Sequence, residues 1–148
     1  MADILHRVGI KSSSMDEVYQ ALTTQAGLAG WWTSNTTGEG NEAGNIIQFR
    51  FGAGGFDMRV TELIAPSYVQ WQVAEGPEEW INTVISFELR QENDYVILLF
   101  KHSDWKEPVE FMHHCSTKWA LFLMSLKALI ETGKGAPDPN DVKIDNWN

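Results

Sequence analysis

Four side chains in the second half of the sequence could carry acid–base, metal or nucleophilic chemistry: His102, His113, His114 and Cys115. His102 falls on the apolar side of an alternating stretch, in phase with Phe100, so its ring is expected to point into the interior. A buried histidine is usually hydrogen-bonded and neutral, whereas a general base also needs a substrate within reach. Two interpretations of His102 follow: a hydrogen-bonded core residue, or a residue that binds a ligand or transfers a proton.

The run His113-His114-Cys115 invites a metal interpretation, but helix geometry opposes it. Adjacent helical residues diverge by about 100°, so the two histidines cannot chelate one ion together, and no spacing matches a structural zinc site. Cys115 lies on the apolar side of the helix and is most simply a small buried hydrophobic residue. As a nucleophile it would need a base such as His102 nearby. We predict no metal, no other cofactor and no catalytic residue.

The positions of these residues depend on a long helix predicted between Pro108 and Gly133. Apolar and small side chains recur every three or four residues from Val109 to Ile130, which is the period of one helical face. Proline is tolerated where a helix starts, and glycine provides a left-handed stop. At ~1.5 Å per residue the helix would be roughly 35 Å long. A broad apolar surface must therefore cover it.

That surface is predicted to be a curved antiparallel sheet of about six strands. One strand is expected over Asp3–Lys11. Alternation of apolar and polar residues then begins at Asn45 and recurs up to His102, interrupted by short turns such as Gly52–Gly55. Consecutive strands joined by short turns form a meander. With the long helix on one face, the sheet defines an α+β protein.

Two short helices and a tail complete the predicted fold. The helices lie between the first two strands, the second over Gln25–Trp31. The segment after Gly135 is rich in Pro, Asp and Asn and is expected to be an exposed extension, with docking of Trp147 left open. We thus expect one domain over residues 1–135 and a tail over residues 136–148.

Composition restricts the class of protein. The 148 residues include only one cysteine, which fits a single domain in the reducing cytoplasm. The net charge of −9 argues against nucleic acid as a partner, because binding it requires cations, and against a polybasic membrane patch. No apolar run approaches the ~20 residues of a membrane span. The N-terminus lacks the pattern of a signal peptide.

The order of strand, two short helices, strand meander and long helix resembles the helix-grip fold of the START-like (SRPBCC) superfamily. Three local motifs are similar to the branch related to the activator of heat-shock-protein ATPase: Leu28-Ala29-Gly30-Trp31-Trp32, Phe100-Lys101-His102-Ser103-Asp104-Trp105 and Glu131-Thr132-Gly133-Lys134-Gly135. The similarity extends to about Gly135. The chain has no room for the additional N-terminal domain of the full-length co-chaperones.

The resemblance implies an internal cavity between sheet and helix. Side chains that strand parity and helical phase place in this space would either fill it as a close-packed core or line a ligand cavity. We favour the cavity, with a small apolar or aromatic molecule as the partner. The residues predicted to contact it are Trp32, Phe49, Met58, Trp71, Phe87, Phe100, His102, Met112, Cys115, Trp119 and Phe122.

Three functions stay open because this superfamily hosts several on one frame. The favoured function is binding of a small hydrophobic molecule, oriented by His102 or an indole N–H. The second is a polyketide cyclase-like enzyme, a dehydratase or a hydrolase on the same fold. The third is an interaction module of the stress response, with a chaperone as partner. A homodimer through a sheet edge or the Trp31-Trp32 region is also left open.

Overall fold

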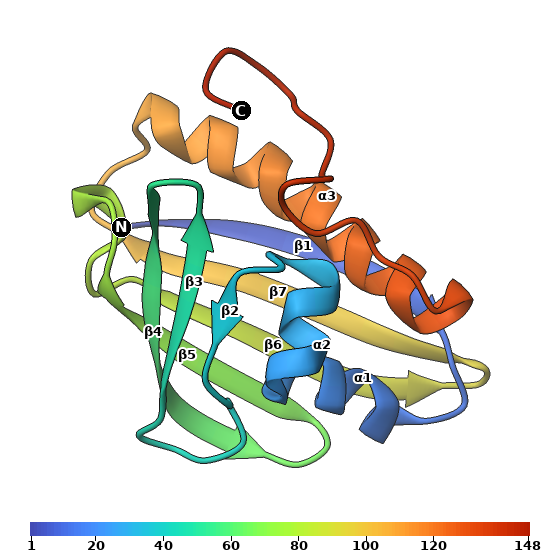
Figure 1. The fold of residues 1–148 in the computed structure, drawn as a ribbon. Coiled ribbons are helices and arrows are strands. Elements are labelled where there is room, and N and C mark those ends of the chain that lie inside the picture. Colours follow the sequence, from blue (N-terminus) through green and yellow to red (C-terminus); the bar gives the residue numbers. More distant parts are fainter.

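The computed structural model describes all residues from 1 to 148 and has a layer of helices on one face of a curved sheet (Figure 1). Seven antiparallel strands follow the order β1-β7-β6-β5-β4-β3-β2. The strands are β1 (Ala2–Lys11), β2 (Thr36–Thr37), β3 (Ile46–Phe51), β4 (Gly54–Ile64), β5 (Tyr68–Glu75), β6 (Val84–Glu92) and β7 (Tyr95–Trp105). The helices are α1 (Met15–Thr23), α2 (Gln25–Trp31), the short 3-10 helix η1 (Glu78–Trp80) and α3 (Glu110–Thr132). The predicted α+β helix-grip fold is confirmed.

The sheet has one strand more than the six expected. The additional strand, β2, consists of only Thr36 and Thr37 and pairs with β3 at one edge of the sheet. Two residues are too few to show the alternation by which a strand is recognised in a sequence. At the opposite edge, β1 pairs with β7, which brings the first strand beside the last (Figure 1).

Helix α3 begins just after Pro108 and ends where the sequence predicted. Gly133 adopts the left-handed conformation with φ of 86°, and its N–H donates to the Leu129 carbonyl at 3.0 Å. Glycine tolerates this φ because it has no Cβ. The helix crosses the concave side of the sheet, as Figure 1 shows, and contacts β1. None of the helices combines the length and the apolar content that a membrane-spanning segment requires.

Helices α1 and α2 close one end of the layer between sheet and α3. Ser14 caps α1 by accepting a hydrogen bond from the Glu17 N–H at 3.3 Å. Trp31 of α2 is fully buried, and its indole N–H donates to the Ala21 carbonyl of α1 at 2.9 Å. The two helices are thereby held together, and Trp32, the next residue, is directed into the interior.

The segment after Gly135 is mostly exposed, as its composition predicted, but it is packed on the domain and does not extend away from it. It folds back along α3, as Figure 1 shows in red. Backbone hydrogen bonds join Asp138 to the chain after α2, with the Asp138 N–H donating to the Trp32 carbonyl at 2.8 Å. Lys118, a buried residue of α3, is paired with the buried carboxylate of Asp141. A charge in an apolar setting needs such a partner, so the polar tail is required for packing.

Candidate functional site

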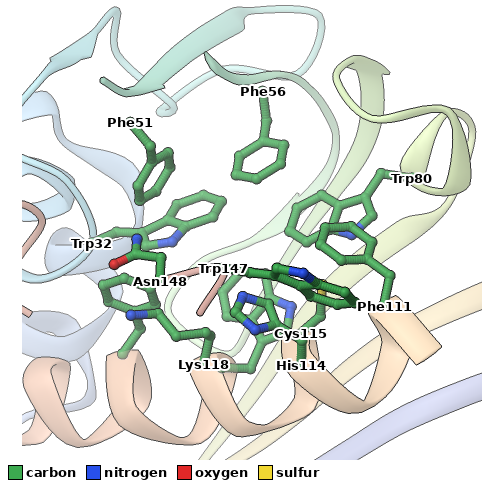
Figure 2. Close-up of a pocket in the computed structure, with 12 residues that line it drawn as sticks. Trp32, Phe51, Phe56, Trp80, Phe111, His114, Cys115, Lys118, Trp147 and Asn148 are labelled. Carbon is green, nitrogen blue, oxygen red and sulfur yellow. The ribbon is translucent and has the colours of Figure 1, made fainter. Parts of the chain in front are cut away.

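A pocket of about 150 Å³ opens at one end of the layer between sheet and helix. The β3–β4 hairpin, η1, the first half of α3 and the end of the tail surround it (Figure 2). Nine of its twelve lining residues are hydrophobic, which is the usual character of small-molecule sites. The lining residues are Trp32, Phe51, Phe56, Trp80, Phe111, His114, Cys115, Lys118, Trp119, Phe122, Trp147 and Asn148.

Parallel aromatic rings form the walls of the pocket. Phe56 of β4 stacks on Trp80 of η1, with ring centroids 4.0 Å apart and planes 11° apart. Trp32 lies on the other side of Phe56 at 5.8 Å, again nearly parallel. The Trp80 indole N–H is buried against the Cys115 thiol, where burial raises the pKa of that thiol and the hydrogen bond from Trp80 acts, with a smaller effect, to lower it. A flat aromatic molecule would therefore find ring faces to stack on.

The floor of the pocket is one face of α3. Trp119 follows Cys115 by four residues and Phe122 follows Trp119 by three, so their side chains lie on the same side of the helix. Cys115 is 4% exposed, and burial raises the pKa of its thiol to about 12. Since the thiolate is the nucleophile, Cys115 is unreactive at neutral pH as long as it stays buried.

His102 points into the interior, as predicted, but its ring nitrogens contact protein atoms and do not line the pocket. Its Nδ1 accepts a hydrogen bond from the Trp119 indole N–H at 3.1 Å, and its Nε2 lies 2.8 Å from Thr83 Oγ1. Thr83 in turn donates to the Trp80 carbonyl at 2.6 Å. Because the Thr83 hydroxyl donates its only proton to Trp80, it must accept from His102, so the proton of the neutral ring lies on Nε2. Burial lowers the pKa of His102 to about 3, which keeps the ring neutral.

The hydrogen bonds that link Trp119, His102, Thr83 and Trp80 matter to the pocket because they hold two of its walls in place. Trp119 is fixed through its indole N–H, and Trp80 through its backbone carbonyl. Both ring nitrogens of His102 are thus occupied by protein atoms. The residue is a positioning residue, and nothing reaches it from the pocket to exchange a proton.

Two polar residues of α3 lie at the rim, and the tail covers both. Lys118 is paired with Asp141, and the His114 imidazole Nδ1 lies 2.7 Å from the Asp145 carboxylate. The hydrogen bond from His114 holds the pKa of Asp145 below its usual range. For Asp141, burial acts to raise the pKa, but hydrogen bonds from Lys118 and Lys143 outweigh it and lower the pKa. The structure gathers no group of three or more His, Cys, Asp or Glu side chains that could hold a metal.

Four of the eleven residues predicted to bind a ligand line this pocket: Trp32, Cys115, Trp119 and Phe122. Six others are buried deeper in the core, away from it: Phe49, Met58, Trp71, Phe87, Phe100 and His102. Met112 is half-buried and lies in a shallow depression with Ile4 and Pro108 instead. The cavity was predicted between sheet and helix; beneath the middle of α3, where those six residues lie, packed aromatic rings fill that space.

The prediction missed eight lining residues: Phe51, Phe56, Trp80, Phe111, His114, Lys118, Trp147 and Asn148. Phe51 and Phe56 carried a usable signal, since each shares the parity of its inward-facing neighbours. Trp80 follows the acidic stretch Glu75–Glu79, and a large aromatic residue in such a loop usually has a packing partner. Nothing in the sequence indicated that Phe111 or Asn148 would reach the pocket.

Residues 12–131 match the family described as activator of Hsp90 ATPase homolog 1-like protein. The chain belongs to this family. The resemblance predicted from the motifs around Trp32, His102 and Gly133 is thereby confirmed. Among curated proteins none matches the chain.

Solved structures extend this result. The chain is 48% identical to the Aha1 dimer of Colwellia psychrerythraea, with 91% of this chain and all of that chain covered and a TM-score of 0.84. CalU16 of Micromonospora echinospora is 16% identical, with 87% of this chain and 74% of that chain covered and a TM-score of 0.71. DynU16, a putative protein in the dynemicin biosynthetic locus, is 21% identical over 90% of this chain and 48% of that chain, with a TM-score of 0.75. The last two show a shared fold.

Proposed function

We propose that the protein binds a small apolar or aromatic molecule in the pocket at the end of the sheet. The observation that carries this proposal is the stack of aromatic walls around an open volume of about 150 Å³. Apolar surface that leaves water for such a site contributes roughly 25 cal/mol per Å². A two-ring ligand that buries about 200 Å² would gain about 5 kcal/mol before the cost of association.

The contacts also indicate how the ligand would be oriented. Phe56 and Trp80 already stack on each other, so a flat ring would stack on the face that one of them turns away from the other. An oxygen on that ring could replace the Cys115 thiol, a weak acceptor, as the group that accepts the hydrogen bond of the buried Trp80 indole N–H. A phenol-like molecule such as 2-naphthol combines the two features and is the probe we choose.

Calorimetric titration with 2-naphthol tests the proposal. We expect saturable binding, weakened about tenfold by Phe56→Ala, because a stacked ring and its apolar area are both lost. Tyr95→Ala is the matched control, because Tyr95 is an exposed aromatic residue at the distant β6–β7 turn. Absence of binding to the wild-type protein, or equal affinity in the Phe56→Ala and Tyr95→Ala variants, would refute the assignment.

A second function is favoured by the family match: interaction with a chaperone ATPase, by a homodimer of this chain in the cytoplasm. The support is the family description and the 48% identity to an Aha1 dimer. Sedimentation equilibrium would detect a dimer. Stimulation of an Hsp90-type ATPase by the purified protein would support the interaction, and the acidic chain predicts that added salt weakens it. A monomer without effect on the ATPase would exclude this function.

A further inference from the structure

The tail is fixed firmly beside the pocket at one point. Lys118 donates to the Asp141 carboxylate, and also to the Val142 carbonyl at 2.8 Å. The side chains of Lys118 and Asp141 are 9% and 2% exposed, so water competes little for this pair. Breaking a buried pair leaves an uncompensated charge. Residue 141 is therefore the anchor of the segment that follows.

Beyond the anchor, a second and more exposed contact holds the tail over the pocket. Asp145 pairs with His114 at 2.7 Å, and the Asp145 side chain is 36% exposed. Trp147 lies over the pocket with its ring 5.5 Å from His114 and 6.3 Å from Phe111 (Figure 2). The Trp147 ring is half exposed. One hydrogen bond between a mostly buried His114 and the partly exposed Asp145, and a half-exposed ring, hold a segment more weakly than the buried Lys118–Asp141 pair does, so this part of the tail can open while the anchor stays.

The chemistry of the closing segment resembles that of a ligand. It places an aromatic ring, from Trp147, against the aromatic mouth of the pocket. It also places a carboxylate, from Asp145, against the donor Nδ1 of His114. A molecule with an aromatic ring and a carboxylate would make the same two contacts. It would also bury apolar surface in the interior of the pocket.

We propose that residues 143–148 are a lid on the pocket, and that an aromatic carboxylate displaces it by replacing Asp145 on His114 and Trp147 at the mouth. The inference rests on the proposed function of the pocket and adds the class of ligand and the way the site opens. The family match ends at residue 131, so the lid lies outside the matched region.

Opening of the lid can be measured without any ligand, because the chain has one cysteine and it lies in the pocket. The rate at which N-ethylmaleimide alkylates Cys115 reports how often the pocket opens. We expect Asp145→Asn to raise this rate about fivefold and Trp147→Ala about tenfold, because each removes one contact of the closed lid. Asp94→Asn, an exposed carboxylate on the distant β6–β7 turn, should leave the rate unchanged.

Urea unfolding of the same variants separates lid opening from global unfolding. A faster alkylation at unchanged free energy of unfolding supports the lid. Unchanged rates in both tail variants, or rates that rise only in proportion to lost global stability, would overturn it. If 2-naphthol still bound the wild-type protein in that case, the proposed function would stand without the lid.

The class of ligand is tested with 1-naphthoate and its neutral analogue 1-naphthamide. We expect Asp145→Asn to improve the affinity for 1-naphthoate about fivefold. His114→Phe, which keeps a ring against Phe111 but removes the donor, should abolish the preference for the carboxylate. Equal affinities for the two probes in the wild-type protein and in both variants would overturn the assignment of an aromatic acid. Failure of 1-naphthoate, 1-naphthamide and 2-naphthol to bind any variant would overturn the proposed function too, even where alkylation shows that the lid opens.

Discussion

The middle and the end of the layer between sheet and α3 are both built from aromatic residues, yet only the end is open. In the middle, Trp71, Phe87 and Phe100 come from neighbouring strands, and successive ring centroids are 5.0 and 5.5 Å apart. Their edge-to-face packing fills the space as a protein core does. At the end, Phe56 of β4 and Trp80 of η1 stack in parallel and leave room beside them.

This comparison shows that the number of aromatic residues does not predict a cavity. Rings on adjacent strands of a sheet are held about one strand spacing apart, so they interlock. Trp80 lies on η1, outside the sheet, so it is free of that spacing and stacks in parallel on Phe56 of β4. The open volume lies where this element replaces a strand as the source of one wall.

The largest expected contrast is in stability. Phe87→Ala removes a fully buried ring from the middle and should lower the free energy of unfolding by about 3–5 kcal/mol. Phe56→Ala removes a half-buried ring beside an existing space and should cost clearly less. Urea denaturation measures both. Equal losses would show that the two regions are packed alike.

A second prediction concerns how stability depends on pH. It depends on His102, which is buried in the core and hydrogen-bonded to Trp119 of the pocket. The unfolded imidazole takes up a proton below its ordinary pKa of about 6.5, whereas the folded one resists protonation down to about 3. Stability contributed by the neutral ring is thus full above pH 6.5 and is lost as the pH falls toward 3, by up to about 1.4 kcal/mol per pH unit.

Urea denaturation at a series of pH values checks this slope. His102→Gln cannot take up a proton, so the variant should lose less stability than the wild-type protein between pH 6.5 and pH 4. Parallel curves for the two proteins would mean that His102 is protonated in the fold.

The smallest effect on stability is expected when a side chain is enlarged at the pocket, and the same kind of change in the core should cost more. Cys115→Leu adds volume at the pocket floor, where space exists, and should change the free energy of unfolding by less than about 1 kcal/mol while weakening 2-naphthol binding. Val73→Phe enlarges a fully buried core residue and should cost about 1–3 kcal/mol or more. A large loss of stability in the Cys115→Leu variant would mean that the pocket is not open in solution.

The residues that alternate or recur regularly were predictable, and those placed by tertiary contacts were not. The period of α3 and its stop at Gly133 followed from helix geometry, and the inward position of His102 followed from strand parity. The burial of Lys118 did not, because a lysine on a mainly apolar helix face gives no hint that Asp141, 23 residues later, returns to pair with it. The position of Trp80 depended on the conformation of an irregular loop, which no period encodes.

The central claim is that a ligand occupies the end of the layer and not its middle. Intermolecular nuclear Overhauser effects between bound 2-naphthol and the protein's aromatic rings test this most directly. We predict contacts from 2-naphthol to Phe56, Trp80 and Trp119. Contacts to Trp71 and Phe87 in their place would contradict the account and move the site into the middle of the sheet.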